Sequence, residues 1–297
     1  MISHLRLNTT KTLSEQITLQ VDDKGYEFVI INHSKFDAAF TLHGAHLIHF
    51  QAKNQAPLIY LSKAALFDDK KAIRGGVPVC WPWFGNTEES LSKKLPAHGF
   101  ARISKWEMSI VSETPEGIDL AFTLSANEAT KAIWDHDFTL TLKASLSDHV
   151  DLSLITENTG NDSFSYGGAL HSYLCVADIT QCSIEGLAAT YTDSLDSGKQ
   201  KTAEAVLTVN GPIDTIYAVN NGDVVVNDLQ NKRKITVNNT GNDSVVVWNP
   251  WISGSIAFAD LPDDGYQTMM CIESAITSKQ GVLVEAGQIH TLKTVII

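Results

Sequence analysis

Two stretches in the first third of the sequence carry side chains that could bind an anion. Arg74 begins the run 74–85 (RGGVPVCWPWFG), where paired glycines let the backbone approach a ligand and prolines and aromatic residues form a stiff wall. A guanidinium beside such a wall suits an anion because its hydrogen bonds are charge-assisted. His98 and Arg102 lie in the stretch 98–102 (HGFAR), where an imidazole and a guanidinium could face one site. These residues alone leave structural roles open for all three side chains.

A histidine and a glutamate later in the chain could form a proton-transfer pair. His171 lies in the stretch 166–174 (YGGALHSYL), where an extended chain puts His171 and Tyr173 on one face and apolar residues on the other. Glu273 follows the apolar run that begins at Thr268. A buried carboxylate without a partner is costly, so one at the end of an apolar strand usually has a partner or a function. A hydrogen-bonded core histidine and a solvent-exposed strand end are the alternatives.

Short β-rich runs separated by turns must position these side chains. Phe138–Leu146 and Val150–Glu157 alternate with a period near two, and a Ser-Asp-His turn joins them. Helix candidates are scarce: Ala126–Trp134 and Ser62–Leu66 are predicted as short helices, whereas Ser255–Ala259 is predicted as a strand. No crossover helices alternate with the strands, so a parallel α/β sheet is disfavoured. The sequence therefore predicts an all-β fold, a large antiparallel β-sandwich with few short helices.

Composition excludes several classes of protein. The chain has 297 residues, of which 43% are hydrophobic and 19% charged, which is ordinary for a globular protein and unlike a disordered one. A formal net charge of -12 without a basic cluster argues against nucleic acid and anionic lipid as partners. No apolar run is long enough to span a membrane, and Met1–Lys11 lacks the pattern of a secretory signal. We expect a single domain over residues 1–297 and a cytoplasmic location.

Metal and cofactor sites have little support in the sequence. The cysteines are Cys80, Cys175, Cys182 and Cys271. They form no Cys-x-x-Cys pair, so buried free thiols in a reducing compartment are expected. His43, His46 and His49 are spaced by three, but the segment is predicted as a strand, in which His46 faces away from the other two. Nucleotide-binding and zinc-peptidase motifs do not occur. We expect neither a metal nor an organic cofactor.

Five motifs, taken in order, resemble those of the hexose-6-phosphate mutarotases. This family, the glucose-6-phosphate 1-epimerases, is related to galactose mutarotase (aldose 1-epimerase). The motifs are Arg-Gly-Gly-x-Pro-x-Cys-Trp-Pro-x-Phe-Gly from Arg74, His-Gly-Phe-Ala-Arg from His98, Leu-His-x-Tyr from Leu170, Trp-Asn-Pro-Trp from Trp248, and Asp-x-Pro-Asp-Asp-Gly-Tyr from Asp260 leading to Cys-Ile-Glu. Each motif is modestly specific, but five in order are strongly so, and the match as a whole is collinear from about Gly44 to about Leu292. The resemblance implies a β-supersandwich that interconverts the α and β anomers of a hexose 6-phosphate without a cofactor.

The resemblance assigns His171 and Glu273 to the catalytic pair and places His98 near the sugar ring. Mutarotation requires a base for the anomeric hydroxyl and an acid for the ring oxygen, and a carboxylate and an imidazole suit these tasks near neutral pH. Glu273 is the expected base, His171 the expected acid, and His98 a hydrogen-bond partner of the sugar. Attraction between an ionised glutamate and a protonated histidine is expected to raise the pKa of His171.

The resemblance also implies that Arg74 and Arg102 hold the phosphate, for which sugar-only mutarotases need no clamp. Asp214 matches an acidic residue that contacts the sugar, although Thr215 stands where the family more often has arginine or lysine. The expected partner is a small sugar phosphate, bound by a monomer. A mutarotase for unphosphorylated aldoses and a non-catalytic sugar-binding module are the alternatives. Comparing rates on glucose and glucose 6-phosphate distinguishes a sugar-phosphate mutarotase from a mutarotase for free aldoses. Polarimetry with and without the protein distinguishes an enzyme from a binding module.

Overall fold

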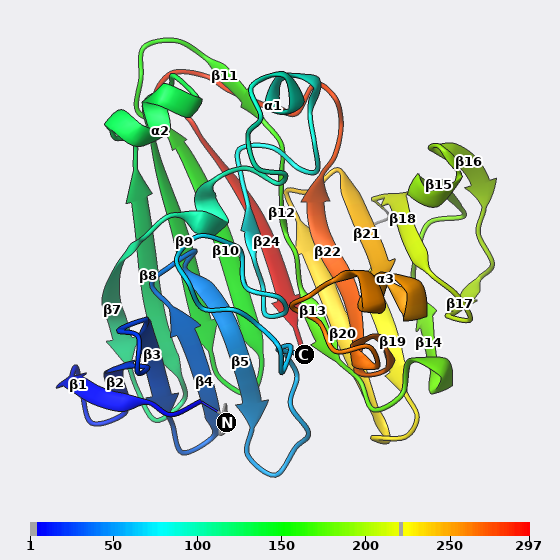
Figure 1. The fold of residues 1–297 in the computed structure, drawn as a ribbon, viewed down its shortest axis with the longest axis horizontal. Coiled ribbons are helices and arrows are strands. Elements are labelled where there is room, and N and C mark those ends of the chain that lie inside the picture. The colour runs from blue at the N-terminus through cyan, green and yellow to red at the C-terminus, as the bar shows by residue number, and fades with distance from the viewer. Residues whose placement is uncertain (1–4, 220–221) are drawn as a thin grey trace.

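The computed structural model describes residues 5–219 and 222–297, which form strands joined by turns with few short helices (Figure 1). The pairings between the named strands are antiparallel. The predicted all-β, antiparallel class is therefore confirmed. No helix among the described residues is both long and apolar enough to cross a membrane.

Within the described residues the strands form three extended sheets and one short pair. The first sheet has the order β1 (Asn8–Thr12), β2 (Ile17–Val21), β3 (Glu27–Asn32), β4 (Phe36–Thr41) and β5 (His46–Ala52). The second has the order β17 (Val206–Thr208), β14 (Cys182–Glu185), β19 (Val224–Asp228), β20 (Arg233–Thr240), β24 (Ile289–Ile296), β10 (Val150–Asn158), β9 (Phe138–Leu146), β8 (Ile118–Ser125) and β7 (Glu107–Glu113). The third has the order β16 (Lys199–Thr202), β15 (Thr190–Asp193), β18 (Ile213–Ala218), β21 (Ser244–Asn249), β22 (Met269–Ile276), β12 (Gly168–Leu170) and β6 (Val79–Cys80), with β13 (Tyr173–Cys175) also on β22.

The remaining elements are short. The short pair joins β11 (Phe164–Tyr166) to β23 (Val282–Val284). The helices are α1 (Glu88–Ser92), α2 (Glu128–Ile133) and α3 (Trp251–Ala257). The 3-10 turns are η1 (Ala101–Ile103), η2 (Ile179–Gln181), η3 (Ser194–Asp196) and η4 (Gly265–Thr268).

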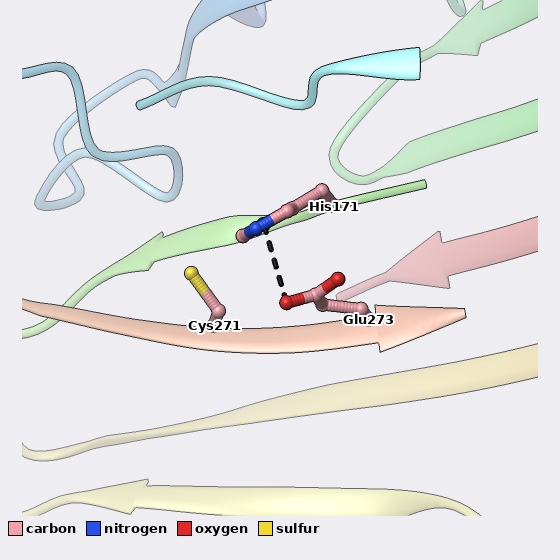
Figure 2. A group of neighbouring side chains, drawn as sticks. All are labelled: His171, Cys271 and Glu273. Carbon is pink, nitrogen blue, oxygen red and sulfur yellow. Dashed lines mark ion pairs between the residues drawn. The ribbon is translucent and has the colours of Figure 1, made fainter. Parts of the chain in front are cut away.

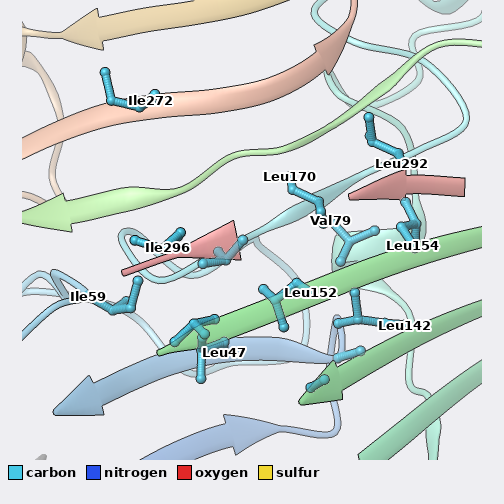
Figure 3. Packing of buried hydrophobic residues seen from close by; sticks show 14 of the residues in the cluster. Leu47, Ile59, Val79, Leu142, Leu152, Leu154, Leu170, Ile272, Leu292 and Ile296 are labelled. Carbon is cyan, nitrogen blue, oxygen red and sulfur yellow. The ribbon is translucent and has the colours of Figure 1, made fainter. Parts of the chain in front are cut away.

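Apolar side chains from the three extended sheets meet in one core. Leu152 of β10 and Leu292 of β24 pack in the same cluster as Ile272 of β22 (Figure 3). Toward the other end of the second sheet, the ring of Phe40 on β4 lies 4.9 Å from that of Phe122 on β8. The second sheet is therefore covered partly by the first sheet and partly by the third, which is the sandwich that the sequence predicts (Figure 1).

Alternation of apolar and polar residues explains the central strands. Along β9 and β10 every second residue is buried and the residues between them are half-buried or exposed. The side chains of a strand point alternately to its two faces, so this pattern places one face on the core and the other toward solvent. The predicted Phe138–Leu146 strand has the bounds of β9, and Val150–Glu157 differs from β10 by one residue.

Two local predictions are wrong and one is confirmed. Ser255–Ala259, predicted as a strand, lies largely in α3, and the side-chain oxygen of Asn249 accepts a hydrogen bond of 2.8 Å from the N–H of Trp251 at its start. The N-cap residue itself, Pro250, makes no side-chain cap hydrogen bond, so the contact from Asn249 and the packing of the folded chain override the local strand propensity. Ser62–Leu66 forms a turn and not a helix. The helix predicted near Ala126–Trp134 exists as α2.

Candidate active site

The strand that carries the predicted glutamate has different surroundings on its two faces. Every residue of β22 is buried. Ile272 belongs to the main core, and side chains alternate along a strand, so Cys271 and Glu273 lie on the opposite face. On that face Cys271 stands opposite Trp248 of β21 on one side and Tyr173 of β13 on the other. The third sheet thus presents a covered face, away from the main core, on which a buried carboxyl stands.

His171 and Glu273 lie together on this face. Nδ1 of His171 is 3.3 Å from Oε1 of Glu273, and Figure 2 shows the two side chains reaching toward one another from adjacent segments. Glu273 is 1% exposed and His171 is 9% exposed. The ring of His171 stacks on Tyr173, with centroids 4.8 Å apart and planes at 9°, as expected for residues that share a strand face. The structure therefore brings the predicted acid and base into one buried site.

Burial controls the protonation of this pair. Desolvation, with the charge of Asp214, raises the pKa of Glu273 well above its usual value, while Arg102 opposes the rise. Desolvation, with the charges of His98 and Arg102, lowers the pKa of His171 well below its usual value. The expectation that the glutamate raises the pKa of His171 is therefore wrong, because the cost of burying either charge outweighs the attraction between them. Burial therefore disfavours the charged form of each group.

His98 is held as a neutral hydrogen-bond donor. The N–H of Gly85 donates to Nδ1 of His98 at 3.1 Å, and the N–H of His98 donates to the carbonyl of Gly85 at 2.7 Å. Desolvation, with the charges of Arg102 and Arg74, lowers the pKa of His98 to about 3. Because Nδ1 accepts a hydrogen bond, the proton of the neutral ring is on Nε2.

The turn that presents His98 depends on a close backbone approach. His98 has φ 63° and Gly99 has φ 73°, both in the left-handed region. A Cβ at Gly99 would lie 1.9 Å from the carbonyl oxygen of Trp81, so only glycine fits there. The turn brings the ring of His98 to 6.1 Å from that of His171, edge to face.

Arg74 is fixed by three neighbours. Its Nε donates to Oδ1 of Asp260 at 3.1 Å, and one of its terminal nitrogens donates to the hydroxyl of Tyr173 at 3.3 Å. Its guanidinium also lies 4.3 Å from the centroid of the Phe258 ring. These contacts orient a largely buried cation beside the tyrosine that stacks on His171. Asp260 begins one of the five motifs, whereas Phe258 lies outside them, and neither residue was predicted as part of the site.

Arg102 and Asp214 complete the charged surroundings of the pair. Arg102 lies in η1, and its guanidinium donates to the carbonyl of Ala97 at 2.8 Å. Asp214 lies on β18 opposite Trp248, and burial raises the pKa of its carboxyl. Arg102 lowers the pKa of Glu273 and Asp214 raises it, so both charges act on the buried carboxyl. All six residues singled out in the sequence thus belong to one electrostatic environment.

A set of metal-ligand atoms occurs where sequence analysis did not place one. His171, Cys271 and Glu273 each offer a ligand atom, and these atoms lie within 4.8 Å of one another. The available signal was the Cys-x-Glu spacing, which puts both side chains on one face of a strand. Among the histidines considered earlier as metal ligands, His46 is buried with its Nε2 2.8 Å from the carbonyl oxygen of Gly75, an ordinary structural contact.

A cavity of about 620 Å³ lies beside the pair and not over it. Its walls include Phe84, Trp134 and Tyr166 but none of the six predicted site residues. Phe84 also contacts His98, with ring centroids 4.9 Å apart. We place the candidate site at the buried pair, because that is where the groups able to transfer protons converge.

Comparison with known proteins identifies the family and the fold of this chain. The family described as aldose 1-epimerase matches residues 26–296. A protein of Escherichia coli K12 named "Putative glucose-6-phosphate 1-epimerase" is 34% identical over 270 residues, which cover 91% of this chain and 90% of that protein. A protein of the same name from Salmonella typhimurium is 33% identical over 86% of this chain and 84% of its own length. A solved structure described as a "putative mutarotase" from Salmonella typhimurium has a TM-score of 0.90 at 30% identity, over 98% of this chain and 96% of that one.

Proposed function

Since the chain belongs to the aldose 1-epimerase family, we propose that it interconverts the α and β anomers of a hexose 6-phosphate, with D-glucose 6-phosphate as the expected substrate. The observation that carries this proposal is the buried pair of His171 and Glu273, whose Nδ1 and Oε1 atoms are 3.3 Å apart. The guanidinium groups of Arg74 and Arg102, whose charges both lower the pKa of His171, support a phosphorylated substrate.

The pair has free atoms for both proton transfers. Oε1 of Glu273 faces Nδ1 of His171, while Oε2 has no hydrogen-bond partner among the described residues and can take the proton of the anomeric hydroxyl. Nε2 is the ring nitrogen of His171 that remains for the ring oxygen of the sugar. Proton transfer to that oxygen opens the ring to an aldehyde, the C1–C2 bond rotates, and the reverse transfers close the ring. Neither step requires a metal or an organic cofactor.

One proton within the pair links its resting state to its working state. A neutral carboxyl with a neutral imidazole holds as many protons as a carboxylate with an imidazolium. The working state forms when the carboxyl proton moves from Glu273 to Nδ1 of His171. A phosphate dianion at Arg74 and Arg102 cancels positive charge that lowers the pKa of His171, so bound substrate favours the imidazolium.

The other predicted residues take supporting roles. Nε2–H of neutral His98 donates to a sugar oxygen and stabilises charge that develops there. Arg74 and Arg102 bind the phosphate through charge-assisted hydrogen bonds. Asp214 contacts a sugar hydroxyl from β18. We further propose that the protein acts as a monomer. The single domain predicted over residues 1–297 stays a prediction, because that range includes residues that the structure does not describe.

Anomer-exchange NMR tests this function directly. The wild type should accelerate anomer exchange of glucose 6-phosphate over the spontaneous rate. Rates on galactose 6-phosphate show which hexose the protein prefers, and rates on glucose show whether it requires the phosphate. Glu273→Gln and His171→Asn should each lower kcat by about 10²-fold or more, the scale of losing a positioned proton-transfer group. Wild-type exchange rates in either variant would remove that residue from the mechanism. Faster exchange of glucose than of its phosphate would instead favour an unphosphorylated substrate, and no acceleration of any sugar would favour a binding module.

A further inference from the structure

The buried pair belongs to a cluster of three residues, of which the proposed proton transfers use only two. His171, Cys271 and Glu273 come from two adjacent segments and converge on one point (Figure 2). All three are buried, and Cys271 has no exposed surface. Oε2 of Glu273 lacks a hydrogen-bond partner among the described residues, and Nδ1 of His171 lies 3.3 Å from Oε1 of Glu273 without forming a regular hydrogen bond. Buried polar atoms are nearly always satisfied, so an unpartnered carboxylate oxygen beside a thiol and an imidazole points to a ligand that reaches them.

The donor set matches the preferences of zinc. Zn²⁺ binds thiolate at about 2.3 Å and imidazole nitrogen or carboxylate oxygen at about 2.0–2.2 Å, which places tetrahedral ligand atoms about 3.3–3.8 Å apart. His171 Nδ1 and Glu273 Oε1 are already 3.3 Å apart, and no two of the three ligand atoms are more than 4.8 Å apart. Closure therefore needs the ligand atoms to approach one another by at most about 1.0–1.5 Å. Mg²⁺ and Ca²⁺ prefer sites built of oxygen and fit poorly.

Charge balance favours a divalent ion here despite the nearby arginines. A thiolate and a carboxylate together neutralise Zn²⁺, and a neutral complex avoids the cost of an unpaired charge in a buried site. The binding step releases the proton of the Cys271 thiol and any proton that Glu273 holds, and it changes no oxidation state. Three protein ligands leave a fourth position for water.

We propose that His171, Cys271 and Glu273 bind Zn²⁺ in competition with the sugar, so that the ion is an inhibitor and not a cofactor. The ion takes the carboxylate and the imidazole that proton transfer requires. Metal binding itself does not depend on the proposed function, whereas the inhibition rests on it.

Cobalt provides a probe of the site that does not depend on activity. EDTA-treated protein titrated with Co²⁺ should develop the near-ultraviolet absorption of a thiolate–cobalt bond, and Zn²⁺ should remove it. Cys271→Ser should abolish the band. Cys175→Ser, which removes the half-buried thiol outside the cluster, is the matched control and should keep the band. Glu273→Gln should keep the thiolate band but weaken Co²⁺ binding about tenfold or more, which keeps the site testable if Cys271→Ser does not fold.

Enzyme kinetics test the competition separately. Zn²⁺ should raise the apparent KM for glucose 6-phosphate and leave kcat unchanged, and the inhibition constant in Cys271→Ser should rise about tenfold or more. A band that is absent from the wild type, or that survives Cys271→Ser, would overturn the site. Activation by Zn²⁺ would overturn its role as an inhibitor. If the wild type epimerises no sugar, the proposed function fails, and the cobalt titration still decides the metal site.

Discussion

Replacing Arg74 by alanine should separate phosphate binding from sugar chemistry. The guanidinium is held by Asp260 at 3.1 Å, by the hydroxyl of Tyr173 at 3.3 Å and over the ring of Phe258 at 4.3 Å. A cation oriented in this way loses little further freedom when it binds an anion. We expect Arg74→Ala to lower turnover of glucose 6-phosphate far more than turnover of glucose.

The size of the loss follows from the type of contact. A hydrogen bond to a charged group contributes about 1.5–3 kcal/mol, so losing one should lower kcat/KM for glucose 6-phosphate about 10- to 150-fold. Arg74→Lys keeps the charge but loses the planar fork that Asp260 and Tyr173 hold, so its loss should be intermediate. Arg102→Ala should show the same preference for damaging phosphate turnover, because Arg102 is the second guanidinium proposed to bind the phosphate through charge-assisted hydrogen bonds.

Anomer-exchange rates for both sugars on each variant provide the assay. Exposed Arg6 is a matched control, and Arg6→Ala should leave both rates unchanged. Circular dichroism checks that each variant folds. Equal losses on glucose and glucose 6-phosphate would refute the reasoning, because they would mean that Arg74 supports the fold or the acid–base pair and that phosphate is held elsewhere.

Three further predictions concern the removal of metal ions, the stability of the fold in acid and the pH dependence of kcat. Exhaustive EDTA treatment should leave exchange of glucose 6-phosphate unchanged; a loss that Zn²⁺ or Mg²⁺ restores would contradict a reaction of proton transfers alone. Desolvation lowers the pKa of His46 from 6.5 to about 3, so between these pH values the unfolded chain binds more protons than the folded chain. The free energy of unfolding should therefore fall as the pH drops from 6.5 to 3, by up to ~1.4 kcal/mol per pH unit. In urea unfolding His46→Gln should lose this slope, and an unchanged slope would count against it. In pH–rate profiles of kcat, the alkaline limb should lie at higher pH with glucose 6-phosphate than with glucose, because phosphate cancels charge that lowers the pKa of His171; coinciding limbs would argue against this coupling.

The sequence predicted the strands that alternate clearly and missed those that do not. Phe138–Leu146 was predicted with the bounds of β9. By contrast, β16 (KQKT) is polar and mostly exposed at the edge of its sheet, so no apolar pattern indicates it. Residues 255–257 of α3 were predicted as a strand because the hydrogen bonds of Asn249 near the start of that helix, to Trp251, Tyr266 and Met269, form only in the folded chain.

The candidate site was predictable as a set of residues but not as a set of contacts. Motifs singled out Arg74, but its partner Asp260 lies 186 residues further along the chain, beyond any local pattern. The pKa directions were also missed. A run such as 268–273 indicates an apolar strand without revealing that both of its faces are covered. This burial raises the pKa of Glu273 and lowers the pKa of His171.

This burial links substrate selection to the chemistry. The positive charges of Arg74 and Arg102 disfavour the protonated form of His171 until an anion compensates them. A sugar without phosphate can occupy the same place but leaves the acid less protonated, so part of the discrimination should appear in kcat and not only in KM. In the proposed mechanism Arg74→Ala removes a contact from glucose 6-phosphate, whereas for glucose it removes only a charge that disfavours protonated His171. Glucose turnover in that variant should stay level or rise, which loss of a purely structural arginine would not produce.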